Sequence, residues 1–239
     1  MNLALRFPKE FVWGTATSSY QIEGAADKDG RGKSIWDVFC DTPGKVANGD
    51  SGLIACDHYH RFEEDIQLMV QMGVKAYRFS ISWSRILPNG MSNSVNQAGI
   101  DFYNSLIDCC LEHGIEPWAT LYHWDLPQHL EEYEGGWLSE SISDRFVDYT
   151  HVCFSVFGDR VKRWITINEA WVVAILGYGQ GVFAPGHNST SEPYLAGHNL
   201  LLAHAKAVDV YRTQFQAEQG GLIGITTVSY THLTLPTKA

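Results

Sequence analysis

The chain has 239 residues, with 17 basic and 27 acidic side chains and a formal net charge of -10. Hydrophobic residues make up 45% of it, enough to bury a core, which excludes a disordered or collagen-like chain. The acidic balance argues against a protein that binds nucleic acid or an anionic membrane, because phosphate contacts need clustered Lys and Arg.

The cysteines and the N-terminus bear on the cellular compartment. Five cysteines occur at irregular spacings without a CxxC pair, which indicates reduced thiols in a reducing compartment: Cys40, Cys56, Cys109, Cys110 and Cys153. Residues 1–8 lack a secretory apolar segment, and no apolar run reaches the roughly 18 residues that a membrane span needs. We therefore expect a cytoplasmic protein, in which the sequon at 188–190 is not glycosylated.

Strand-like and helix-like segments alternate along the chain. Short apolar, β-branched or aromatic runs predict strands at 11–16, 76–81, 117–122, 163–167 and 222–227. Four stripes with helical spacing lie between them: Phe62, Ile66, Met69 and Val70; Tyr103, Leu106, Ile107 and Cys110; Phe146, Tyr149, Cys153 and Val156; Leu201, Ala205, Val208 and Tyr211. Gly73, Gly114 and Gly158 follow the first three stripes as helix stops. This order predicts an α/β protein with a parallel sheet.

Two α/β architectures compete, an open doubly wound sheet and a (β/α)8 barrel. No glycine-rich phosphate loop follows any predicted strand, which weakens the nucleotide-binding form of the open sheet. Polar side chains instead gather where strands end, as at the catalytic face of a barrel: Gln21, Glu23, His123, Asp125, Asn168 and Glu169. One unit takes roughly 50 residues and a closed barrel about 400, so we expect a (β/α)8 TIM barrel truncated to about its first four and a half units.

The run WITINEAW at 164–171 places an amide–carboxylate pair directly after a β-branched strand. A carboxyl group in a partly apolar, aromatic-lined pocket has its charged form disfavoured, so Glu169 would be a proton donor near neutral pH. Asn168 can offer both a donor and an acceptor to a substrate hydroxyl. Alternatively, Glu169 begins a helix, where a carboxylate interacts favourably with the helix dipole. The octapeptide alone leaves both interpretations open.

Two further runs suggest contacts to hydroxyl groups. In LYHWDLP at 121–127, His123 can hydrogen-bond a sugar hydroxyl while the neighbouring ring packs on the sugar's apolar face; alternatively, it is a loop histidine held by Asp125. In SYQIEG at 19–24, the bidentate amide of Gln21 suits vicinal hydroxyls, although a loop glutamine is usually just solvated.

Charged residues in two other runs need an explanation. Arg78 lies inside an otherwise apolar strand, where an unpaired guanidinium is costly, so it needs a carboxylate partner nearby. DHYHR at 57–61 could suggest a metal site. However, His58 and His60 would point apart on a helix, so we interpret this run as a helix start with a solvated face.

Taken together, these runs resemble glycoside hydrolase family 1, the β-glucosidase family of (β/α)8 barrels. The resemblance extends from about residue 8 to 227 and includes FVWGTAT at 11–17, YQIEG at 20–24, the strand of Arg78, the loop of His123 and Trp124, TINE at 166–169 and FAPG at 183–186. Within the family, the chain is most similar to the cytosolic β-glucosidase and lactase-like type. The resemblance implies a retaining β-glycosidase that acts on β-glycosides without a metal or other cofactor.

The resemblance also implies a role for each matching residue. Glu169 corresponds to the general acid/base, and Asn168 to the contact with the sugar 2-hydroxyl, where hydrogen bonds strengthen in the transition state. The remaining roles concern the sugar and the second carboxylate: Gln21 and His123 would hold the 3- and 4-hydroxyls with Trp124 close by, Trp171 would line the aglycone side, and Arg78 would pair with the catalytic nucleophile.

The chain departs from the family pattern at two places. Ala170 stands where most members have Pro, which leaves the adjacent carboxylate in place. The family nucleophile is a Glu on the seventh strand, which this sequence does not reach, so we expect residues 1–227 to be the N-terminal half of a barrel, inactive without the C-terminal half. Residues 228–239 are interpreted as a tail outside the family, read out of frame. The alternative is a non-catalytic glycan-binding or protein-binding barrel, but the retained Asn168–Glu169 pair favours an enzyme.

Overall fold

The computed structural model describes residues 7–227 and has one sheet of five strands. These are β1 (Gly14–Ala16), β2 (Ala76–Ser80), β3 (Glu116–Tyr122), β4 (Arg163–Asn168) and β5 (Leu222–Thr226). Each strand pairs in parallel with the next one in sequence. Such sequential parallel pairing, with a helical connection between strands, is the arrangement of a (β/α) barrel wall.

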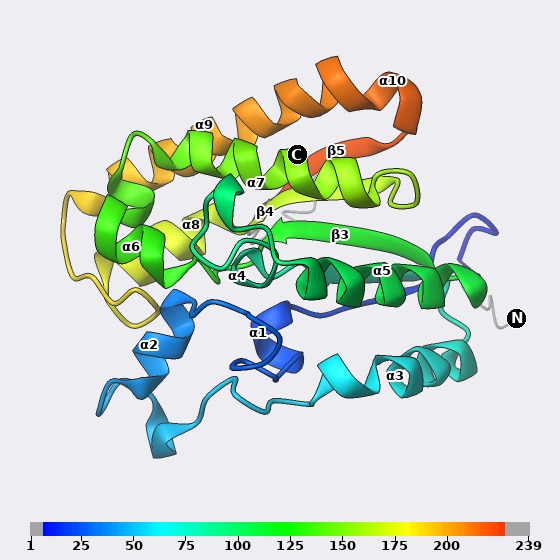
Figure 1. Cartoon of the computed structure of the whole chain (residues 1–239), viewed down its shortest axis with the longest axis horizontal. Helices are drawn as coiled ribbons and strands as arrows, with labels where there is room; N and C mark the ends of the chain where they lie inside the picture. Colours follow the sequence, from blue (N-terminus) through cyan, green and yellow to red (C-terminus); the bar gives the residue numbers. More distant parts are fainter. Residues whose placement is uncertain (1–6, 228–239) are drawn as a thin grey trace, which may run out of the picture.

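Four long helices make the connections between strands. They are α3 (His58–Met72), α5 (Gln97–Glu112), α7 (Ile142–Phe157) and α9 (Glu192–Val210). In Figure 1 the four helices run alongside the strands in chain order, from α3 at the bottom of the view through α5 and α7 to α9 at the top. The shorter helices are α1 (Ser19–Ile22), α2 (Ile35–Asp41), α4 (Trp83–Ile86), α6 (Gln128–Glu134), α8 (Ala170–Val172) and α10 (Gln216–Gln219). Short 3-10 and π turns complete the loops: η1 (Ala47–Gly49), η2 (Ser92–Ser94), η3 (Gly136–Leu138), η4 (Val173–Gly179) and η5 (Tyr211–Phe215).

The strand predictions are confirmed in number and order, and the largest error in extent falls on the first strand. Only Gly14–Ala16 pairs with β2, whereas Phe11, Val12 and Trp13 are 43%, 53% and 53% exposed. The pairing at Gly14 depends on glycine, because a Cβ there would lie 2.8 Å from the carbonyl oxygen of Ala76. An apolar run thus predicted three strand residues that lack a ladder partner among the described residues.

The helix stops are confirmed, and the first two use the freedom of glycine. Gly73 caps α3 at φ 75° and Gly114 follows α5 at φ 68°, in the left-handed region where a Cβ is unfavourable. Gly158 caps α7 at φ -71°, an ordinary helical conformation that any residue can adopt. At the third stop the backbone conformation therefore does not require glycine.

The fourth helical stripe is wrong by about one residue. Leu201 is 58% exposed and Ala205 is also exposed, whereas α9 buries Ala196, Asn199, Leu200, Ala203 and Ala207. Tyr211, the last member of the predicted stripe, is buried as expected but lies in η5. Small side chains on this face let α9 pack closely against α7, its main neighbour. Val70, predicted for the first stripe, is 39% exposed for a similar reason, because Ile66 and Met69 already form the buried face of α3.

The core lies between the sheet and the helices. Its largest fully buried side chains include Trp83, Trp137 and Trp164, and Trp83 stacks on Tyr149 with ring centroids 4.9 Å apart. None of the helices in the described part of the chain is long and apolar enough to cross a membrane. The predicted tail at 228–239 lies outside the described residues.

Candidate active site

Five of the predicted site residues converge at the carboxyl ends of the strands. Gln21 is carried by α1, His123 and Trp124 follow β3, Asn168 ends β4, and Glu169 comes directly after it. Because all five strands are parallel, these ends lie at one edge of the sheet, on the side where α1, α2, α6 and α8 gather in Figure 1. This is the edge at which a barrel carries its active site.

A chain of hydrogen bonds joins three strands at this edge. Arg78 in β2 donates from Nε to Thr120 Oγ1 at 2.9 Å and from Nη2 to Asn168 Oδ1 at 2.6 Å. Asn168 Nδ2 lies 3.2 Å from His123 Nε2. Since a guanidinium can only donate, the acceptor oxygen of Asn168 is fixed, and its amide donates to His123 Nε2. The proton of the neutral imidazole is thereby assigned to Nδ1, which is buried without a hydrogen-bond partner among residues 7–227.

The imidazole of His123 is neutral at physiological pH. Burial first, and then the positive charge of Arg78, lower the pKa of His123 to about 4. The alternative in which Asp125 holds this histidine is wrong, because Asp125 Oδ2 accepts a hydrogen bond from Ser19 Oγ at 2.7 Å instead. His123 is therefore poised to exchange hydrogen bonds with neutral polar groups such as hydroxyls.

Glu169 lies at an unusual backbone position. Its φ of 54° is left-handed, its N–H donates to Thr226 O at 2.8 Å, and it is the N-cap residue of α8. The interpretation as a helix start is thus correct for the backbone, but the carboxylate makes no capping hydrogen bond. The side chain, partly buried, instead affects Arg78: burial lowers the pKa of Arg78, and the charge of Glu169 offsets this only in part.

A second left-handed residue supports the same edge. Trp124 has φ 74°, and its indole Nε1 donates to Asn168 O at 2.9 Å. A non-glycine residue in this region costs on the order of 1–3 kcal/mol and persists only where its surroundings hold it. Such residues cluster at functional sites, and here two of them, Trp124 and Glu169, flank Asn168.

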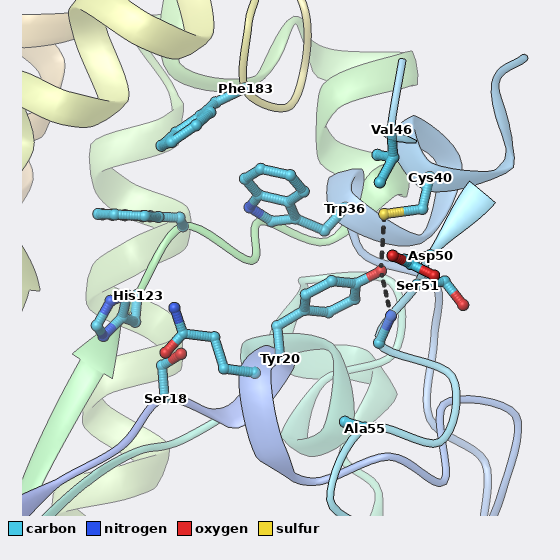
Figure 2. A pocket seen from close by; sticks show the side chains of 13 residues that line it. Ser18, Tyr20, Trp36, Cys40, Val46, Asp50, Ser51, Ala55, His123 and Phe183 are labelled. Atoms are coloured by element: carbon cyan, nitrogen blue, oxygen red, sulfur yellow. Dashed lines mark hydrogen bonds between the residues drawn. The ribbon is translucent and has the colours of Figure 1, made fainter. Parts of the chain in front are cut away.

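An aromatic cavity of about 380 Å³ adjoins Gln21, His123 and Trp124. Figure 2 shows Tyr20, Trp36 and Phe183 around it. Its other lining residues are Ser18, Cys40, Val46, Asp50, Ser51, Gly52 and Ala55. The rings of Trp36 and Tyr20 stack with centroids 6.0 Å apart, and Trp36 and Phe183 are 5.5 Å apart. The cavity thus combines hydroxyl-binding groups with flat apolar walls, a combination that suits a sugar ring.

Sequence reasoning missed most of the cavity wall. Tyr20 and Phe183 lie within the family-like strings YQIEG and FAPG, which gave a signal that was not used. Trp36, on α2, had no such signal. Tyr20 donates to Cys40 Sγ at 3.4 Å and accepts from Gly52 N at 3.2 Å, and burial raises its pKa well above the usual value.

Three predicted residues lie elsewhere. Glu23 was placed at the polar face, but it is buried and accepts from Arg85 Nε at 3.0 Å. Trp171 is 52% exposed on α8 and does not line the cavity, so its predicted aglycone role stays a prediction. His58 is not on a solvated face, since it is 2% exposed and bonds Asp65 at 2.6 Å. Within residues 7–227, no group of three or more His, Cys, Asp or Glu side chains is arranged to hold a metal ion.

Comparison with known proteins gives consistent matches. The family model for glycosyl hydrolase family 1 matches residues 3–238. Beta-glucosidase 1B of Phanerodontia chrysosporium is 56% identical over 233 residues, which cover 92% of this chain and 43% of that protein. Beta-glucosidase A of Thermotoga maritima is 56% identical over 220 residues, covering 92% and 48% respectively. The chain therefore spans a little under half the length of these relatives.

Solved structures support the same comparison. A rice β-glucosidase variant in a covalent complex with glucose superposes with a TM-score of 0.91 at 54% identity, covering 92% of this chain and 48% of that one. A family 1 β-glucosidase of the fungus Humicola insolens in complex with glucose gives 0.89 at 50% identity, with the same coverage. These matches confirm the predicted TIM-barrel fold, of which the five described strands form part.

Proposed function

This chain belongs to glycosyl hydrolase family 1, and we propose from that premise that it supplies the acid/base side of a retaining β-glucosidase site. The observation that carries the proposal is the group formed by Arg78, Asn168 and Glu169. Arg78 is partly buried, it is held by neutral acceptors, and Glu169 lies close enough for its charge to affect the pKa of Arg78. A fixed cation beside a partly buried carboxylate suits a site in which two carboxylates flank one bond.

In the proposed reaction, Glu169 protonates the departing glycosidic oxygen and later removes a proton from the attacking water. Asn168 contacts the 2-hydroxyl, where hydrogen bonds strengthen as the transition state forms. Gln21 and His123 hold the 3- and 4-hydroxyls beside Trp124. The neutral state of His123 suits this role, because a neutral imidazole can both donate to and accept from hydroxyls.

Retention needs a second carboxylate about 5 Å from the first to attack the anomeric carbon. Among residues 7–227, Glu169 is the one carboxylate whose charge reaches Arg78. Glu23 is paired with Arg85, and Asp125 is buried against Ser19, so neither is free to attack. We propose that the nucleophile comes from outside the described residues and pairs with Arg78, so that the 239-residue chain alone has no appreciable turnover.

The substrate proposal draws on the relatives. The curated matches bear β-glucosidase names, and the rice variant was crystallised in a covalent complex with glucose. A covalent glycosyl intermediate is the mark of the retaining mechanism. We therefore propose β-D-glucosides as the substrate class and retention as the stereochemical outcome.

The test compares two proteins on p-nitrophenyl β-D-glucoside. One is the 239-residue chain, and the other is a chimera that fuses residues 1–227 to the part of Thermotoga maritima β-glucosidase A beyond the aligned region. We expect p-nitrophenol release from the chimera and none from the chain. Turnover by the chain that Glu169→Gln abolishes would contradict the missing nucleophile. A folded chimera that binds the glucoside without cleaving it would favour a glycan-binding barrel.

A further inference from the structure

One buried carboxylate near the sugar site has no part in the proposed chemistry. Asp125 is 1% exposed, its Oδ2 accepts from Ser19 Oγ at 2.7 Å, and its Oδ1 is buried without a hydrogen-bond partner among the described residues. Burying a carboxyl group with half of its acceptor capacity unused is unfavourable. The hydrogen bond between Asp125 and Ser19 is thus made at a cost, and we ask what it does for the site.

Ser19 is the first residue of α1, the four-residue helix that carries Gln21. So short a helix cannot hold its own conformation, because isolated helices under about 12 residues are marginal in water. Its first residue is instead fixed from two sides: Ser19 N donates to Ser80 Oγ at 2.7 Å, and the Ser19 hydroxyl donates to Asp125. The place of Gln21 thus depends on contacts made by the start of its helix.

Asp125 belongs to the segment that presents the other hydroxyl-binding group. It follows His123 and Trp124, and Trp124 is held in a left-handed conformation by its hydrogen bond to Asn168 O. The Ser19–Asp125 hydrogen bond therefore joins the loop after β1 to the loop after β3. It lies two residues from Gln21 on one side and two residues from His123 on the other.

We propose that Asp125 is a positioning residue, whose hydrogen bond with Ser19 fixes Gln21 relative to His123 so that the two side chains meet neighbouring hydroxyls of one sugar. The inference rests on the proposed function, in which these two residues bind the glycone. A positioning role for Asp125 differs from a purely structural role in one respect. An effect of Asp125 on ligand affinity must act through Gln21 and vanish when Gln21 is removed.

The first experiment is a mutant cycle on ligand affinity, with the full 239-residue chain and the non-hydrolysable p-nitrophenyl 1-thio-β-D-glucoside in a calorimeter. The double variant Ser19→Ala/Asp125→Ala removes both partners, so no buried carboxylate is stranded; the Ser80 hydroxyl, which donates to Ser19 Oγ at 3.2 Å in the wild type, still accepts from the backbone N–H of residue 19. We expect it to weaken binding about ten-fold in the wild type and less than two-fold in a Gln21→Ala background. Additive losses in the two backgrounds would overturn the proposal.

Two further variants separate positioning from stability. Asp125→Asn keeps an acceptor for Ser19 and should bind within about two-fold of the wild type. Ser143→Ala is the matched control, because Ser143 is a fully buried serine on α7 whose hydroxyl donates to Glu140 O at 3.3 Å and accepts from Lys206 Nζ at 2.9 Å. We expect it to lower the melting temperature without changing the affinity. An equal loss of affinity in Ser143→Ala would assign the effect of Asp125 to stability alone.

Hydrogen exchange provides a readout that needs no ligand. In the wild type, the amide of Gln21 donates to Ser18 O at 3.1 Å. Loss of the Ser19–Asp125 hydrogen bond should speed exchange at residues 19–22 at least ten-fold and leave the amides of α7 unchanged. Unchanged exchange in α1 would contradict the proposal. Absence of thioglucoside binding by the wild-type chain would overturn this role, which needs Gln21 and His123 to bind the glycone in this chain, and would leave the proposed function to the test on the chimera. Binding that is sensitive to Gln21 but not to Asp125 would also overturn the positioning role alone.

Discussion

Arg78 and Arg85, on β2 and just after it, differ in how their charge is compensated. Arg85 is 1% exposed, donates to the Glu23 carboxylate at 3.0 Å, and lies over the ring of Tyr59 at 4.4 Å. Although burial opposes it, Glu23 raises the pKa of Arg85. Arg78 has the neutral acceptors Thr120 and Asn168, and burial leaves its pKa lowered.

The difference separates a charge that serves the fold from one that we propose serves the candidate site. The charge of Arg85 is balanced within the described part of the chain, so its pair with Glu23 serves the fold by tying the loop after β1 to the loop after β2. The charge of Arg78 has no ion-pair partner within residues 7–227 and faces the edge that carries Glu169. A partly buried cation whose charge is offset only in part, by Glu169, suits a site that binds or receives an anion.

We expect the largest effect when the ion pair between Glu23 and Arg85 is broken. Glu23→Gln leaves Arg85 buried without a counter-charge, which should lower the free energy of unfolding by about 3–5 kcal/mol in urea titrations. The matched control is Glu134→Gln, which removes a partner of Arg145 near the surface, where the side chains are 34% and 20% exposed. That loss should be about 1 kcal/mol or less. Equal losses in the two variants would refute the structural assignment of Arg85.

The next effect is the change that the charge of Arg78 makes to the pKa of His123. NMR titration of His123 should give a midpoint near its pKa of about 4, lowered by burial and then by Arg78. Arg78→Met should move this midpoint back toward the usual 6.5. A midpoint that does not move would mean that burial alone keeps His123 neutral.

The pH dependence of stability tests the pKa values of His123 and Asp125. The folded state binds a proton at His123 less readily than the unfolded state. The stability that neutral His123 contributes is therefore lost as pH falls from about 6.5 to about 4. Burial raises the pKa of Asp125 to about 6, and the stability from its bound proton is lost as pH rises from about 3.8 to about 6. Each contribution is roughly 3 kcal/mol and the two oppose each other. In His123→Gln only the Asp125 contribution remains, so the free energy of unfolding should decline as pH rises from about 4 to about 6. A rise in that range would contradict the assignment.

The smallest expected effect is the stability change from Arg78→Met. Two hydrogen bonds to neutral acceptors are lost, but the cost of burying an uncompensated charge is also removed. We expect the free energy of unfolding to change by about 1 kcal/mol or less in urea titrations. A loss as large as that of Glu23→Gln would place Arg78 among the structural charges.

Features decided by local spacing could be predicted from the sequence. Alternation of strands and helices, the stops at Gly73 and Gly114, and the strand end at Asn168 follow from periodicity and backbone conformation. The pairing of Glu23 with Arg85 could not, because the two residues are 62 positions apart and the sequence pattern pointed to Arg78 instead. Spacing likewise does not show which apolar face of α9 meets α7, where small side chains rather than Leu201 are buried.

The candidate site shows the same division. Asn168 and Glu169 could be found because a β-branched strand leads directly to them, and His123 because it follows another strand. The wall formed by Trp36 and Phe183 arises from helix α2 and a distant loop, which meet only in the folded chain, so spacing carries no information about it. The hydrogen bond from Ser19 to Asp125 was missed for the same reason, since it spans 106 positions.

The central claim is that Glu169 donates the proton to the leaving group, and the most direct test varies that group. In the chimera, kcat/KM is measured for wild type and Glu169→Gln on p-nitrophenyl and 2,4-dinitrophenyl β-D-glucosides. The second leaving group departs without protonation. We expect Glu169→Gln to lower kcat/KM about 10²–10⁴-fold on the first substrate and less than about ten-fold on the second. Equal losses on both substrates would contradict the assignment of Glu169 as the proton donor.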